Sequence, residues 1–285
     1  MLRYRQDIRS LAFVALTIAA LLAPHSQHMQ GMLLGQPFAC VPWIFMTGVL
    51  CFIASVINHN HMHSRMFRLP ALNLLLNVAL SLARGHTASG IIVPHHYNHH
   101  AEASSPEDWI RPQLAGSGLG WIRLGRFVVT ASLNMMVRRT EQNAPALPAR
   151  MRRSQQFERT FLIAAVGIAF LHDWWACLIF NVVPWLLGLA MLVGVNLLQH
   201  DDCLPDLPYG ESRNFTGPIG NWLFFNNGYH TAHHNRPSLH WSKLPQRHAI
   251  LAARLPRPDL EQSSILSFLW HFGWHRTPAA VAYSG

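Results

Sequence analysis

The feature that most limits how this chain can fold is a pair of long apolar runs, at residues 38–57 and 161–200. A helix needs about 20 apolar residues to cross a bilayer, so the first run is long enough for one span and the second for two. Helices are expected because lipid offers no partners for backbone polar groups. The charged fraction points the same way, since 12% of the residues are charged against about 25% in soluble domains. The sequence therefore predicts an all-α integral membrane protein.

The second run must turn once, and two positions are open. A turn at 181–184 would leave His172 and Asp173 at membrane depth, where an uncompensated polar pair is costly. We therefore favour a turn at 172–175. A shorter apolar run after the N-terminal arginines supplies a further span. The expected spans lie at about residues 10–23, 38–57, 159–172 and 175–200.

The basic charge of the chain, +9 at neutral pH, has two readings. Nucleic-acid binding is one, but the arginines cluster beside apolar spans, where positive flanks mark the cytoplasmic side of a membrane protein. We expect membrane orientation and no nucleic acid. Residues 58–158 and 201–285 are then cytoplasmic parts of one domain, 1–285. Within the first part, residues 117–137 are predicted to form an amphipathic helix in the membrane interface.

Three histidine clusters fall in the expected cytoplasmic parts. Within each cluster the imidazoles lie one helical turn apart and point the same way. The members are His59 and His63 in the first, His96, His99 and His100 in the second, and His230, His233 and His234 in the third. Neutral imidazole ligates transition metals, and eight such groups exceed the needs of one zinc ion. A single cluster of this kind has an ordinary structural explanation, but three of them indicate a site for two metals.

His200 is a ninth candidate ligand, at the end of the last expected span. A helix over 175–200 would be about 39 Å long, enough to cross the bilayer and project beyond it. It would carry His200 and Asn196, one turn earlier, toward the cytoplasmic clusters. His95 and His61 lie off the ligand faces of their helices, so we expect neighbours rather than ligands there. Iron, zinc, copper and nickel all suit such a donor set.

The three histidine boxes resemble those of a known protein family. The boxes His59-x3-His63, His96-x2-His99-His100 and His230-x2-His233-His234 resemble those of the membrane fatty acid desaturase superfamily, which includes hydroxylases, carotenoid ketolases and alkane hydroxylases. The residues around the third box look like bacterial fatty acid desaturases in particular. Asn196-x3-His200 is similar to the family's additional ligand, whose Asn holds a metal-bound water. The resemblance covers about residues 40 to 250.

This resemblance implies an O₂-dependent oxidoreductase with two non-haem irons and four spans. It would introduce a double bond into an acyl chain carried as a lipid, on coenzyme A or on acyl carrier protein. The chain shows no fused electron-transfer module, so a separate ferredoxin, rubredoxin or cytochrome b5 is expected to supply electrons. The site would lie on the cytoplasmic face of the bacterial inner membrane. No side-chain acid or base is expected beyond the metal ligands.

Two kinds of alternative stay open. On the same scaffold the outcome could be hydroxylation, acetylenic bond formation or oxidative decarboxylation to an alkene. From another class comes a metal-handling membrane protein without enzymatic activity. That reading would call for ionisable residues within the spans, and the sequence offers few of them there.

Overall fold

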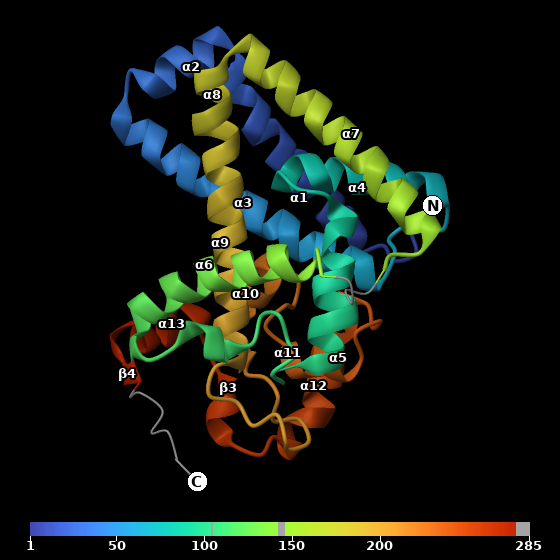
Figure 1. The fold of residues 1–285 in the computed structure, drawn as a ribbon, viewed down its shortest axis with the longest axis vertical. Coiled ribbons are helices and arrows are strands. Elements are labelled where there is room, and N and C mark those ends of the chain that lie inside the picture. The colour runs from blue at the N-terminus through green and yellow to red at the C-terminus, as the bar shows by residue number, and fades with distance from the viewer. Residues whose placement is uncertain (104, 142–145, 278–285) are drawn as a thin grey trace. The chain divides into compact units, whose positions relative to one another are not determined.

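The computed structural model describes residues 1–103, 105–141 and 146–277, whose regular secondary structure is almost entirely helical (Figure 1). The strands have two residues each. β1 (Gly118–Leu119) pairs antiparallel with β4 (Arg276–Thr277), and β2 (Asn214–Phe215) pairs parallel with β3 (Glu261–Gln262). The predicted all-α class is confirmed.

The chain groups into two compact units, each built from two segments of sequence. The first unit comprises Met1–Ile92 and Ala146–Leu192. Its elements are α1 (Asp7–Leu22), η1 (Ala23–His25), α2 (Gln27–Leu34), α3 (Pro37–His63), α4 (Pro70–Arg84), η2 (Ala88–Ile91), α7 (Ala149–His172), α8 (Trp174–Cys177), η5 (Leu178–Val182) and the first part of α9 (Val183–His200).

The second unit comprises Val93–Pro145 and Val193–Gly285. Besides the strands and the end of α9, it contains η3 (Ile92–His99), α5 (His100–Glu102), η4 (Pro112–Ala115), α6 (Gly120–Arg138), α10 (Pro218–Leu223), α11 (His230–Asn235), η6 (Trp241–Lys243), α12 (Leu244–Leu251), η7 (Ala252–Arg254), η8 (Pro258–Leu260) and α13 (Ile265–Trp274). Because each unit takes two separate stretches of chain, neither is a contiguous domain, and the single-domain organisation stays a prediction.

Three of the described helices are long and apolar enough to cross a bilayer: Asp7–His25, Pro37–His63 and Trp174–His200. They cover three of the four expected spans. The remaining one, 159–172, forms the second half of α7, whose first half carries Arg150, Arg152, Arg153, Glu158 and Arg159. That charge leaves α7 with a short apolar part, so a fourth span stays a prediction.

The helix break after α7 falls where the sequence predicts the turn. α7 ends at His172, and the Asp173 carboxylate accepts hydrogen bonds from the backbone N–H groups of Trp175 and Ala176 at 3.0 and 2.9 Å. Asp173 thereby caps α8, and the Gln30 side chain also donates to it. The carboxylate is thus supplied with donors, and the two helices are separated by one residue.

A buried carboxylate fixes α7 within the first unit. Glu158 accepts hydrogen bonds from Asn77 of α4 at 3.0 Å and from the backbone and hydroxyl of Ser89 of η2, both at 2.9 Å. Burial of a charge is costly unless hydrogen bonds and countercharge compensate it. These donors supply that compensation and hold η2, which leads directly into the second histidine box.

Candidate metal centre

His96 and His99 of the second histidine box lie on a π-helix, η3, and His100 follows as the first residue of α5. In a π-helix the hydrogen bonds join residues five apart, and such turns are frequent at functional sites. His95 therefore lies one turn from His100, and their ring centroids are 4.6 Å apart. The His96 and His100 rings are 6.3 Å apart. The sequence prediction assumed α-helical spacing, in which His96 would occupy that place.

Four histidines of the second unit bring their ligand atoms within 4.8 Å of one another: His99, His200, His230 and His234. We call them the four-histidine group. The Nε2 atom of His200 lies 3.2 Å from that of His99 and 3.0 Å from that of His230, and the His230 and His234 Nε2 atoms are 3.2 Å apart. Three stretches of sequence, around residues 99, 200 and 230–234, thus converge on one point.

For two of these histidines, the hydrogen-bond partner of the Nδ1 atom indicates which ring nitrogen carries the proton. The Nδ1 atom of His99 lies 2.9 Å from the Asp108 carboxylate, and that of His200 lies 2.8 Å from the backbone carbonyl of Glu211. A carboxylate and a carbonyl accept hydrogen bonds, so both Nδ1 atoms carry the proton and donate. In a neutral imidazole the lone pair is then on Nε2.

This assignment places two lone-pair nitrogens, His99 Nε2 and His200 Nε2, 3.2 Å apart. Two acceptors at that distance repel each other unless a cation lies within reach of both. Metal-bound histidines almost always donate the other ring N–H to a carboxylate or carbonyl, which is the arrangement of both residues. The donor set therefore fits a transition-metal ion.

The charge state of His234 also suits a ligand. Burial, together with repulsion from the neighbouring imidazoles, lowers the pKa of His234 well below the ordinary value of 6.5. Its ring is therefore neutral at physiological pH, with a lone pair available for a metal.

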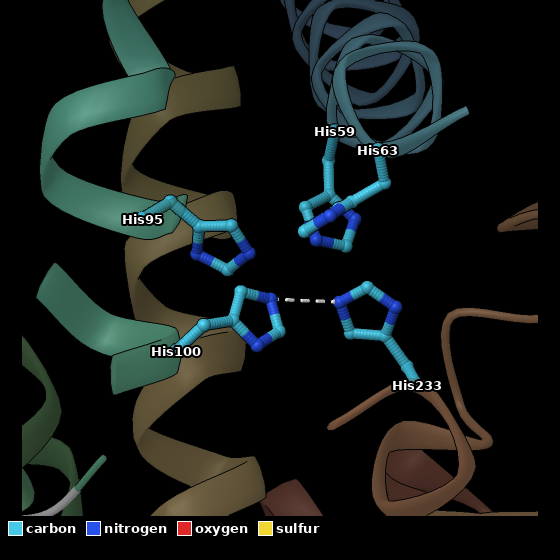
Figure 2. A group of neighbouring side chains, drawn as sticks. All are labelled: His59, His63, His95, His100 and His233. Carbon is cyan, nitrogen blue, oxygen red and sulfur yellow. Dashed lines mark hydrogen bonds between the residues drawn. The ribbon is translucent and has the colours of Figure 1, made fainter. Parts of the chain in front are cut away.

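Three further histidines of the second unit form what we call the three-histidine group: His95, His100 and His233. Figure 2 shows His100 and His233 directed toward each other, with their Nε2 atoms 3.1 Å apart. His95 enters from the same stretch of chain as His100, and the ligand atoms of all three lie within 4.8 Å. Of the predicted ligands, His96 is the one in the second unit that joins neither group among the described residues.

The first box lies at the end of α3 in the first unit. His59 and His63 project from the same helix, with ring centroids 4.8 Å apart (Figure 2). The one-turn pairing predicted from the sequence is present. His61, which the sequence excludes from the ligands, is buried and accepts a hydrogen bond from the backbone N–H of Met66 at 3.3 Å.

Asn196 lies one turn before His200, as predicted. Its amide Nδ2 donates to the backbone carbonyl of Ile110 at 3.3 Å. That contact fixes the side chain beside the segment that carries Asp108. Its expected role toward a bound water stays a prediction.

A tight turn positions the third box. Phe225 and Asn226 have positive φ values of 52° and 59°, and Gly228 follows. A Cβ atom on Gly228 would lie 2.1 Å from the backbone carbonyl oxygen of Phe215, so this position needs glycine. The Phe215 N–H in turn donates to the Gly228 carbonyl at 2.8 Å. Strand β2 and the turn are thereby locked together immediately before α11.

Sequence reasoning missed the groups that orient the ligands. Asp108 carried a usable signal, since it is a carboxylate nine residues after His99, but other acidic residues lie nearby in the sequence. Asn214 donates to and accepts from Thr231, which follows His230, at 2.9 and 3.0 Å. The carbonyl of Glu211 carried no signal, because backbone groups are the same at every position.

With this geometry in place, comparison with known families decides the class of protein. Residues 36–266 match the sequence model of the family described as fatty acid desaturase. The chain belongs to the fatty acid desaturase family. A search of curated proteins gave no match. The three long apolar helices among the described residues, together with this family, fit an integral membrane protein, and the histidine clusters can hold metal.

Proposed function

We propose that this desaturase-family protein is an O₂-dependent fatty acyl desaturase that uses two non-haem irons to introduce a double bond into an acyl chain. The observation that carries the proposal is the four-histidine group, in which the Nε2 atoms of His99 and His200 lie 3.2 Å apart while their Nδ1 atoms face a carboxylate and a backbone carbonyl. Family membership supplies the reaction class.

The four-histidine group would hold one iron and the three-histidine group would contribute to the second. On the resemblance of the boxes we add His59 and His63 to the second set. His95 and His96 compete for one place in it, because box spacing favours His96 while ring geometry within the second unit favours His95. The two irons, reduced by the separate electron donor, would activate O₂, which is the oxidant. The acyl chain would lose two hydrogens, the donor would supply two electrons, and both oxygen atoms would leave as water.

The residues of the chain have three tasks in this reaction. Asp108 and the Glu211 carbonyl hold protons on the outer nitrogens of His99 and His200, so the inner nitrogens stay available to metal. Burial of His99, His200 and His230 excludes water from the ligands. Asn196 is proposed to orient a water or hydroxide beside His200. The apolar helices suit an acyl chain as the substrate.

Electrons are proposed to come from a separate protein such as a ferredoxin, a rubredoxin or cytochrome b5. We place the protein in a bacterial inner membrane with its site on the cytoplasmic face, on the basis of the arginine distribution and the bacterial character of the third box. The acyl chain would be presented as a membrane lipid or as a thioester of coenzyme A or acyl carrier protein.

Lipid profiling tests the reaction directly. Cells that express the chain should accumulate acyl chains with one additional double bond, and cells that express the His230→Ala variant at equal membrane abundance should not. Accumulation of hydroxylated or acetylenic chains, or of a terminal alkene, would retain the family chemistry and overturn desaturation. Unchanged lipids in the presence of a competent electron donor would contradict the proposal.

A further inference from the structure

The last helix, α13, exposes a row of large apolar side chains. Leu266, Trp270 and Trp274 are 74%, 61% and 58% exposed and lie one turn apart along one face. The opposite face contributes Phe272 to the interior. The family match ends at residue 266, so most of this row lies beyond it. The proposed reaction assigns no role to these side chains.

α13 is fastened to α6 within the second unit, and the two helices lie side by side in Figure 1. The Gly120 N–H donates to the His275 carbonyl at 2.9 Å, continuing the β1–β4 pairing. A Cβ atom on Gly273 would lie 2.1 Å from the Trp121 ring, and the Arg123 guanidinium lies 5.4 Å from the centre of the Phe272 ring. Glycine at position 273 lets α13 approach Trp121 of α6 closely, so the two helices are packed tightly against each other.

Helix α6 also exposes a row of apolar side chains. Its buried face contains Phe127 and Ala131. On the opposite face four apolar side chains recur every three to seven residues, each more than half exposed: Ile122, Val129, Leu133 and Met136. We call these side chains, together with Leu266, Trp270, Trp274 and Trp121, the α6–α13 surface.

Two properties of this surface identify what covers it. First, its tryptophans gather at one end, with the Trp274 ring 6.4 Å from Trp121 and 5.7 Å from Trp270. Tryptophan is enriched where a membrane meets water, since its ring is apolar and its N–H is polar. Second, residues 117–139 and 263–277 contain no Asp or Glu but carry exposed Arg126 and Arg276. Cations beside an apolar face suit anionic lipid headgroups.

The sequence predicts an interfacial helix over 117–137, which corresponds to α6. We propose that α13 extends this contact, so that the whole α6–α13 surface lies in the interface of the membrane, with Leu266 and the α6 row among the acyl chains and the three tryptophans near the headgroups. The surface would hold the second unit, which carries the four-histidine group, against the lipid. This inference does not depend on the identity of the metals.

Depth measurements on the full-length protein in vesicles of phosphatidylcholine with a minority of phosphatidylglycerol test the inference. A nitroxide label is attached to single cysteines at Leu266, Val129 or Ser238, with the four native cysteines replaced. Ser238 is the control, because it is exposed in the same unit but follows the third box. Labels at Leu266 and Val129 should collide more with dissolved oxygen than with a water-soluble nickel complex, and the label at Ser238 should show the reverse.

A second measurement keeps the native cysteines. In vesicles with brominated acyl chains, the W270F/W274F double variant should lose emission that the lipid quenches in the wild-type protein. The proposal is overturned if the label at Leu266 responds mainly to nickel, or if the lost emission is unquenched by brominated lipid. Protection of Leu266 from both reagents, with spin–spin broadening, would identify a second copy of the chain as the occupant and likewise overturn it.

Discussion

Replacement of Asp108 by asparagine tests how the metal ligands are oriented. The carboxylate is fully buried, lies 2.9 Å from His99 Nδ1 and accepts the Ile110 backbone N–H at 3.0 Å. An asparagine side chain at this position could keep one neutral hydrogen bond but would lose the charge that makes His99 a better donor to metal. Substitutions at such positions cost about 10- to 100-fold in metal affinity, equivalent to about 1.4–2.8 kcal/mol at about 1.4 kcal/mol per tenfold change.

The assay is competition for iron between the purified protein and a chelator of known affinity. Glu107→Gln is the matched control, since this neighbouring carboxylate is exposed and its side chain accepts from the Ser105 hydroxyl at 3.0 Å. We expect weaker iron binding by Asp108→Asn and wild-type binding by Glu107→Gln. Equal affinity of wild type and Asp108→Asn would refute the reasoning that Asp108 sets the His99 tautomer for a metal.

Three further substitutions probe other parts of the site. His95→Ala should lower iron content more than His96→Ala, because the π-helix brings His95 beside His100. If metal analysis shows the opposite order, His96 is the ligand, as the spacing of the box predicts. Gly228→Ala should lower the yield of folded protein in membranes, because the new Cβ atom would clash with a backbone oxygen of β2. Gly220→Ala is the control, since a Cβ atom there meets open space and the variant should express normally. Equal yields of the two variants would contradict the close contact between Gly228 and β2. His200→Ala should abolish activity and reduce iron while the protein stays folded in the membrane, and retention of full iron would remove His200 from the ligands.

The fold class was predictable because apolar runs and the bilayer leave few choices. The break between α7 and α8 was predictable for the same reason, since Asp173 had to lie at a turn or find donors, and it does both. The charged first half of α7 was visible in the sequence, and the span expected over 159–172 stays a prediction. The grouping into two units comes from contacts between distant segments, which periodicity does not report.

The histidine clusters were predictable as clusters, because ligand spacing on a helix is a local property. Their membership was harder to predict, because the choice between His95 and His96 depends on the helix type. A π-helix joins residues five apart rather than four, which changes the side chains that share a face. His200 could be inferred from helix length. Its partner at the Glu211 carbonyl could not, because that contact depends on a loop that returns to the helix end.

The central claim is that the clustered histidines hold two irons. Protein expressed with ample iron and purified in detergent should contain about two irons per chain, because some of the described histidines form two groups of neighbouring ligand atoms. Metal analysis calibrated by quantitative amino-acid analysis measures this ratio. A ratio near two supports the account. A ratio near one, or full activity in protein without iron, would contradict it.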